Sequence, residues 1–162
     1  MTENDVVIVA AARTPQGRLK GQLAGFAATE LGSIAIRGAL DRAGISPGVV
    51  DAVIVGQVLQ AGAGQNPARQ AAIGAGIGWD VHAVAVNKVC LSGLTAIIDA
   101  TRMLRLGDAT VVVAAGMESM TRAPHLLMGS RFGWQYGTVA ALDSMAYDGL
   151  TDAYDHESMG AP

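Results

Sequence analysis

Short runs of apolar, largely β-branched residues alternate along this chain with stretches of helical periodicity, and no other feature limits the possible folds as much. These runs occupy residues 6–12, 51–59, 81–89 and 110–115. The first is apolar on both faces, which is typical of a strand covered on both sides in a parallel sheet. Strands that alternate with helical stretches of this length indicate βαβ crossovers, so the predicted fold class is α/β with helices on both faces of the sheet.

The helices expected between these strands carry recognisable end signals. Thr29 is the predicted cap of a first helix, which should end at Gly44. Asn66-Pro67 predicts the start of a second helix, because asparagine caps helices and proline suits a first helical position. A third helix is predicted over residues 90–106.

Periodicity weakens after residue 116, where methionines are interspersed with glycines and aromatic residues. We therefore expect residues 1–116 to form an α/β domain and residues 117–162 to begin a loop-rich excursion. No internal repeat, low-complexity tract or flexible linker marks a second independent domain.

Charge and hydropathy exclude two classes of partner. The chain has 14 acidic and 11 basic residues, and the basic ones are scattered, so we expect no nucleic-acid partner. Its longest apolar runs fall far short of the roughly 20 residues that cross a bilayer. The acidic start lacks the basic segment of a signal peptide, which predicts no membrane partner and a cytoplasmic location. Only 15% of the residues are charged, so part of the surface is expected to be covered by another structure.

Cys90 is the only cysteine and cannot form an internal disulfide. In an intracellular chain it is therefore a packed core thiol or a nucleophile. It lies in the motif Asn87-Lys88-Val89-Cys90-Leu91-Ser92-Gly93, where the predicted strand ends and the predicted helix begins. Amides at a helix start stabilise a thiolate and a developing oxyanion, which favours the nucleophile. Spacing alone is equally compatible with a small apolar core residue.

Several separated blocks resemble those of thiolases, the acyl-CoA acyltransferases. They are ARTPQG at 12–17, GQNPARQ at 64–70, the cysteine motif, and GMESMTRAP at 116–124. The stretch DGLTDA at 148–153, followed by Met159-Gly160, is similar to the family's loop region that contacts coenzyme A. The resemblance covers the whole chain and is closest to the acetyl-CoA acetyltransferase branch. It implies a thiolase-like layered fold, of which this chain carries the amino-terminal part.

The resemblance also implies a mechanism in two steps. A cysteine takes an acyl group from one thioester, and a second acyl-CoA carbanion, or free coenzyme A in reverse, attacks the acyl-enzyme. Cys90 matches the acyl-accepting position, and Leu150 and Met159 would line the coenzyme A and acyl pocket. A leucine or methionine in a loop can equally serve packing alone. Acyl-CoA is the expected substrate, with neither a metal nor a resident cofactor.

The chain departs from the thiolase pattern in what it does not contain. Thiolases also use a histidine and a second cysteine, both from a carboxy-terminal half that is absent here. We therefore expect an incomplete active site and an isolated chain that is inactive or impaired. Leu91 is a smaller departure, since the residue after the nucleophile is often glycine, alanine or serine.

None of the three histidines is expected to replace the missing base. His82 precedes Cys90 by eight residues of extended chain, which places it far from the thiol. His125 follows a methionine-rich turn, and His156 lies in an acidic segment that favours a solvated or salt-bridged role. The charged residues of the 116–124 block, Glu118 and Arg122, are predicted to order loops rather than to transfer protons.

Three functional hypotheses remain open from the sequence. The first is a thiolase-type acyltransferase, acting as a homo-oligomer or with a complementary thiolase chain. The second is a non-catalytic remnant or assembly module that binds acyl-CoA or an intact homologue. The third is a ketoacyl-synthase-like condensing enzyme, although the 12–17 and 116–124 blocks look like thiolase rather than synthase.

Overall fold

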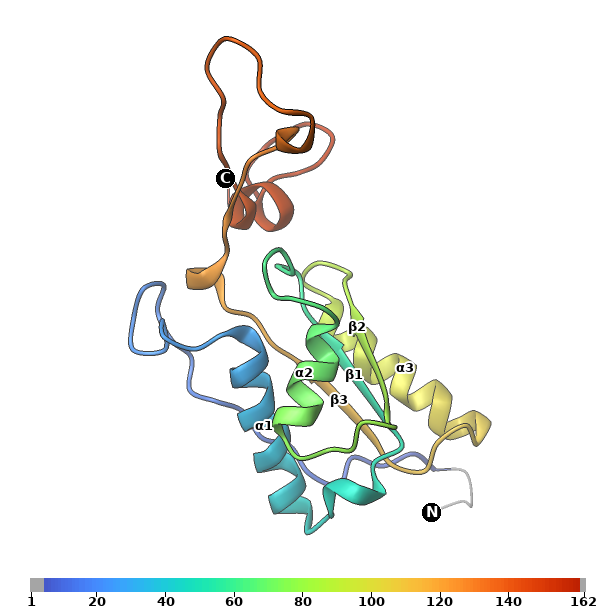
Figure 1. Ribbon diagram of the computed structural model, residues 1–162. Coiled ribbons are helices and arrows are strands. Elements are labelled where there is room, and N and C mark those ends of the chain that lie inside the picture. Colours follow the sequence, from blue (N-terminus) through green and yellow to red (C-terminus); the bar gives the residue numbers. More distant parts are fainter. Residues whose placement is uncertain (1–4, 161–162) are drawn as a thin grey trace.

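The computed structural model describes residues 5–160, which form a three-stranded parallel sheet with helices on both faces (Figure 1). The elements up to residue 116 are α1 (Ala28–Ala43), η1 (Pro47–Val49), β1 (Ala52–Gly56), α2 (Pro67–Gly74), β2 (His82–Val86), α3 (Ser92–Leu106) and β3 (Val112–Gly116). They are followed by η2 (Met120–Arg122), β4 (His125–Leu126), η3 (Ser130–Phe132), β5 (Leu142–Asp143) and the π-helical turn η4 (Ala146–Leu150). The first four residues and the last two, which are the outer ends of the predicted 1–116 and 117–162 segments, lie outside the described residues.

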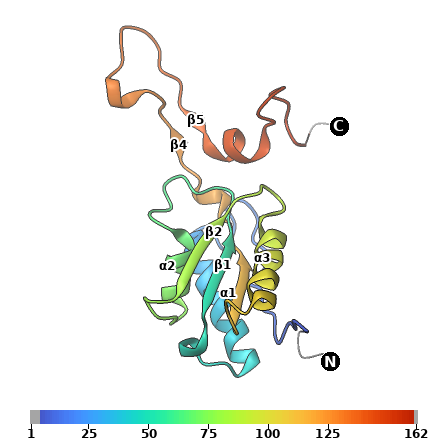
Figure 2. The ribbon, with the colours of Figure 1, turned by 90° about the vertical axis from the view of Figure 1, so that its right-hand side faces the viewer.

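The sheet has the strand order β2-β1-β3, and both pairings are parallel. Gly56 at the end of β1 pairs with Val86 of β2 on one side and with Gly116 of β3 on the other. Helix α2 carries the chain from β1 to β2, and α3 carries it back across the sheet to β3. Figure 2 shows α3 on the face opposite α1 and α2. The predicted α/β class, with βαβ crossovers and helices on both faces, is confirmed.

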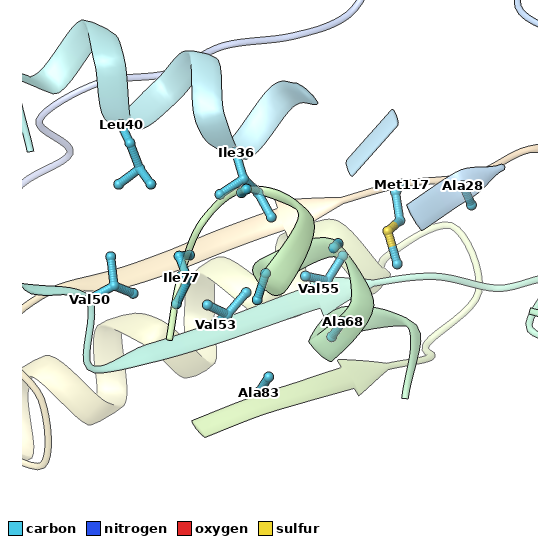
Figure 3. Packing of buried hydrophobic residues seen from close by; sticks show 13 residues of the cluster. Ala28, Ile36, Leu40, Val50, Val53, Val55, Ala68, Ile77, Ala83 and Met117 are labelled. Atoms are coloured by element: carbon cyan, nitrogen blue, oxygen red, sulfur yellow. The ribbon is translucent and has the colours of Figure 1, made fainter. Parts of the chain in front are cut away.

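The core lies in two layers because side chains alternate along β1. Val53 and Val55 are fully buried on the face covered by α1 and α2, where they meet Ile36 and Leu40 of α1 (Figure 3). Ile54 points to the other face and packs against the alanines of α3. The continuously apolar run of β1 is therefore explained by burial on both faces.

The predicted first strand at residues 6–12 is wrong. The segment is irregular and pairs with none of the strands described here. Ile8 is 79% exposed and Val9 is 68% exposed, and the segment is attached through Ala11, whose carbonyl accepts a hydrogen bond from Arg42 at 2.8 Å. A β-branched run favours extended backbone, but a strand also needs a neighbour that supplies hydrogen bonds, and no sequence pattern reveals whether one is present.

Helix ends follow the predictions in part. The predicted cap Thr29 lies inside α1, which begins after Ala27; the N–H of Ala27 donates to the Glu30 carboxylate at 2.7 Å. At the other end Gly44 adopts φ +66°, which confirms it as the terminating residue. Asn66 is confirmed as the cap of α2, and its side chain accepts from the N–H of Arg69 at 3.1 Å.

Residues 117–160 form a loop-rich segment that extends beyond the carboxyl ends of the strands (Figures 1 and 2). Its regular structure consists of the antiparallel pair β4–β5 and a few single turns. The division of the chain into a domain over residues 1–116 and a loop region over residues 117–162 stays a prediction. No helix within residues 5–160 is long and apolar enough to span a membrane.

Candidate active site

A cavity of about 740 Å³ opens at the carboxyl ends of β1 and β3. After β1 the chain continues to α2, whereas after β3 it continues into the loop-rich segment. Crevices where the chain leaves neighbouring strands in different directions are common ligand sites in α/β sheets. The walls of the cavity come from α1 and the loop before it, the ends of β1 and β3, the segments that follow these strands, and the start of α3. The lining includes Ala12, Arg13, Thr14, Pro15, Gly56, Gln57, Val58, Val89, Cys90, Ser92, Gly93, Gly116, Met117 and Glu118. Three of the four blocks that resemble thiolases therefore meet in one place.

Cys90 lies on the wall of this cavity and its side chain is exposed. It immediately precedes Leu91, the N-cap of α3, so the helix begins at Ser92 rather than at Cys90 as predicted. The first turn of a helix carries N–H groups without intrahelical partners and a partial positive charge. An exposed thiol beside such a turn and facing a cavity has the access that a nucleophile requires, whereas a core thiol would be buried.

The backbone just before Cys90 has an unusual conformation. Val89 adopts φ +48°, in the left-handed region that β-branched residues very rarely enter. Its N–H donates to Oδ1 of Asn87 at 3.0 Å, and its carbonyl accepts from Oγ of Ser92 at 2.6 Å. Ser92 Oγ in turn accepts from the N–H of Lys88 at 2.9 Å, and Ser92 is only 4% exposed. Side chains of the cysteine motif therefore hold the peptide groups on both sides of Val89.

The start of α3 lies directly against the end of β1. A Cβ atom placed on Gly56 would be 2.5 Å from the carbonyl carbon of Ser92 and 2.6 Å from the nitrogen of Gly93. Only glycine allows this approach, since the two nearest atoms belong to backbone. The glycine at the end of β1 thus sets the position of the helix start that follows Cys90.

Glu118 fastens the loop after β1 to the end of β3. Its carboxylate accepts from the N–H of Val58 at 2.9 Å and from that of Leu59 at 3.2 Å. Burial raises the pKa of the Glu118 carboxyl above its ordinary value, and the two amide hydrogen bonds oppose this rise. The prediction that Glu118 and Arg122 order loops is confirmed, because Arg122 donates to the carbonyl of Gly25 at 3.2 Å.

Gln57 is a part of the site that the sequence analysis missed. It is 2% exposed, and its Nε2 donates to the carbonyl of Leu59 at 2.9 Å. Its Oε1 is buried and has no hydrogen-bond partner among residues 5–160. A single amide directly after a wholly apolar strand was the available signal, because a buried polar side chain at a strand end usually has a specific partner.

The predicted pocket residues Leu150 and Met159 lie together, since the N–H of Met159 donates to the carbonyl of Leu150 at 2.8 Å. Neither is among the residues that line the cavity of Cys90. The turn that ends at Leu150 nevertheless packs beside that cavity, because a Cβ on Gly149 would be 3.1 Å from Leu59 and 3.7 Å from Val58. Their contact with coenzyme A stays a prediction.

The three histidines also lie away from the cavity, whose described lining contains none of them. His82 begins β2, so it is separated from the cysteine motif by the length of that strand, about 13 Å at 3.3 Å per residue. His125 belongs to the short strand β4, and His156 is exposed in the loop near the carboxyl end. His156 also contributes, after several hydrogen bonds, to lowering the pKa of Asp152.

Comparison with known proteins agrees with this geometry. The family model described as the thiolase N-terminal domain matches residues 6–162. A probable acetyl-CoA acetyltransferase of Mycobacterium tuberculosis is 60% identical over 155 residues, which cover 96% of this chain and 39% of that protein. An acetyl-CoA acetyltransferase of Cupriavidus necator is 53% identical, with 96% of this chain and 40% of the relative covered. A cytosolic acetyl-CoA acetyltransferase of Gibberella zeae is 50% identical, with 96% and 39% covered.

The chain thus spans about two fifths of the length of the curated relatives it matches. The matched region includes the cysteine motif, the glycine-lined strand ends and the loop-rich segment. This chain belongs to the thiolase family and corresponds to an N-terminal portion of its members.

Proposed function

We propose that this chain supplies the nucleophile of a thiolase-type acyl-CoA acyltransferase, and that Cys90 is the residue acylated. The proposal is carried by one observation: the thiol is exposed on the wall of a cavity at the carboxyl ends of parallel strands, beside the first turn of α3. The names of the relatives, which are acetyl-CoA acetyltransferases, support acetyl-CoA as the acyl donor.

The chemistry of the first step is an exchange of one thioester for another. The thiol of Cys90 loses its proton to solvent, and the sulfur attacks the carbonyl carbon of acetyl-CoA. The bond between that carbon and the sulfur of coenzyme A breaks, and coenzyme A leaves as a thiolate that takes up a proton. The product is an acetyl thioester on Cys90, which a second acyl-CoA carbanion or free coenzyme A then attacks.

The partial positive charge at the start of α3 would support this step by stabilising the negative oxygen that develops on the carbonyl. The three histidines of the chain lie away from the cavity, and Cys90 is its only cysteine. We therefore propose that the chain carries out the first half-reaction at a low rate, and that carbon–carbon bond formation requires residues supplied from elsewhere.

Intact mass spectrometry after incubation with acetyl-CoA tests the proposal. Since Cys90 is the only cysteine, a single acetyl adduct that hydroxylamine removes identifies a thioester at that residue. The adduct should be missing from Cys90→Ala, whereas acetyl groups on lysine would persist in both proteins and resist hydroxylamine. A folded chain that acquires no thioester would contradict the proposal.

Leu150 and Met159 are proposed to contact the coenzyme A part of the donor. The turn ending at Leu150 lies against Leu59, in the loop that follows β1 and passes beside the cavity. Leu150→Ala and Met159→Ala should raise the acetyl-CoA concentration needed for half-maximal acetylation of Cys90. Their rates of alkylation by iodoacetamide should stay unchanged, because that reagent makes no contact with a coenzyme A site.

An assembly module that pairs with an intact homologue is the second candidate. Large apolar side chains outside the cavity favour it, since Ile8, Val9 and Leu106 are each more than two thirds exposed. Copurification with a full-length thiolase, together with no acetylation of Cys90, would favour this module over the enzyme. A homo-oligomer and a cytoplasmic location are further proposals; the Gibberella zeae relative, whose name includes the word cytosolic, supports the second.

A further inference from the structure

The left-handed conformation of Val89 needs a cause, because the residue type disfavours it. A β-branched side chain at positive φ is strained, and such strain persists only where the surroundings impose it. Val89 is 44% exposed, so burial of its own side chain does not impose the conformation. We therefore attribute the left-handed conformation of Val89 to the hydrogen bonds of its backbone.

Two side chains hold Val89 from opposite ends. Oδ1 of Asn87 accepts from the N–H of Val89, and Oγ of Ser92 donates to its carbonyl, which also accepts the backbone N–H of Ser92 at 3.1 Å. Oγ of Ser92 also accepts a hydrogen bond from the N–H of Lys88, so one buried hydroxyl links Lys88 to the carbonyl of Val89. Because Ser92 is buried, water does not readily replace that hydroxyl when it is removed.

Asn87 is itself fixed to the neighbouring strand ends. Its Nδ2 donates to the carbonyl of Val58 at 3.3 Å, and the N–H of Val58 donates to Glu118. The residues that follow β2, β1 and β3 are therefore connected in this order by hydrogen bonds, and Val89 lies at one end of the series. A turn held in this way fixes the position of the next residue, Cys90.

We propose that Asn87 and Ser92 are positioning residues, which hold Val89 in the left-handed conformation and thereby aim the Cys90 thiol into the cavity. Neither needs to touch the substrate. The proposal rests on the proposed function in one respect, namely that Cys90 is the residue whose placement matters.

A conformational rescue tests this role. Glycine adopts positive φ without the penalty of a Cβ, so Val89→Gly removes the need for side chains that impose the conformation. Strain of this kind disfavours a conformation by about 5- to 150-fold when nothing holds it. Ser92→Ala and Asn87→Ala should therefore slow acetylation of Cys90 by about tenfold or more in the chain with Val89. In the chain with Val89→Gly the same substitutions should slow it by less than about threefold.

Two further variants separate positioning from general damage. Asn87→Asp keeps an oxygen that accepts the N–H of Val89 but loses the Nδ2 donor to Val58, so it should retain part of the rate that Asn87→Ala loses. Thr101→Ala removes a hydroxyl that bonds the carbonyl of Ile97 within α3, distant in sequence from the cysteine motif, and it should leave the rate unchanged. Asn87 is exposed, so its variants remain informative if the loss of the buried Ser92 hydroxyl unfolds the chain.

Alkylation by iodoacetamide, measured on all variants, makes the two proposals separately testable. If the unaltered chain accepts no acetyl group but alkylation shows the same rescue by Val89→Gly, positioning holds and the acyltransfer function fails. Suppose instead that acetylation occurs while Asn87→Ala and Ser92→Ala each slow a reaction by the same factor in the Val89→Gly chain as in the chain with Val89. In that case the acyltransfer function holds and positioning is refuted. Unchanged rates in Asn87→Ala would also refute positioning.

Discussion

Replacing Gly56 with alanine tests how closely α3 is placed against the sheet. The new Cβ would lie 2.5 Å from the backbone of Ser92, about 0.9 Å inside the 3.4 Å at which ordinary van der Waals contact begins. The two nearest atoms are backbone and the third is the Cβ of Ser92, so no side-chain rotation relieves the overlap and α3 must move relative to β1. Overpacking usually costs about 1–3 kcal/mol, and an immobile neighbour places this substitution at the upper end, about 3 kcal/mol. For a chain of this size that corresponds to a fall in Tm of about 6–12 °C.

Gly116→Ala is a matched control, because Gly116 pairs with Gly56 across the sheet. Its Cβ would lie 3.7 Å from Gly93 and 3.9 Å from the carbonyl of Gly56, which is ordinary contact. We expect its stability to change by less than about 1 kcal/mol in either direction. Urea and thermal unfolding, followed by far-ultraviolet circular dichroism, measure both variants. Equal losses in the two variants would refute the close contact between the start of α3 and the end of β1.

Three other perturbations give distinct results. Burial raises the pKa of Glu118 above 4.5 in the native state, so over this pH range the native chain binds more protons than the unfolded chain. The free energy of unfolding therefore falls as pH rises from below 4.5 through the raised pKa. Glutamine does not titrate, so the urea midpoint of Glu118→Gln does not share this fall. The difference between the two midpoints, Glu118→Gln minus the unaltered chain, should therefore be larger at about pH 7 than at about pH 4. A difference that is the same at both pH values would contradict the raised pKa. Asn66→Ala should cost about 1–2 kcal/mol through loss of the α2 cap, and Asn66→Gly less, because glycine tolerates φ +42°; equal urea midpoints for the two variants would contradict the backbone argument. Ile36→Ala should cost about 2–5 kcal/mol, whereas Ile34→Ala, at a position 46% exposed on the same helix, should cost under about 1 kcal/mol in the same denaturation experiment.

Much of the sheet was predictable because its evidence is local. The apolar run that contains β1 requires burial on both faces, and β1 occupies the interior of that run. Gly44 and Asn66 mark helix ends by their own backbone and side-chain chemistry, so reading single positions located those ends correctly. The cap of α1 was misplaced at Thr29 because the N–H of Ala27 is satisfied from inside the helix, by Glu30.

Partnership between distant segments could not be predicted in the same way. Residues 6–12 have the composition of a strand, but pairing is a property of two segments and composition describes only one. Glu118 was identified as a loop-ordering residue, yet its partners Val58 and Leu59 lie about sixty positions away, at the end of another strand. A pattern read along the chain indicates what a segment favours, whereas the contact between strand ends depends on the fold.

The cysteine motif shows the opposite relation between local preference and structure. Residues 81–89 favour extended backbone, and the strand prediction continued through Val89, but β2 ends at Val86 and Val89 turns to positive φ. Local rules fail where a site imposes a conformation that its own residues disfavour. Here the disfavoured conformation falls on the residue before the only cysteine, and the side chains that bond to it belong to the same motif. The predicted strand ends three residues beyond the end of β2, and those three residues form the turn that, in our proposal, positions Cys90.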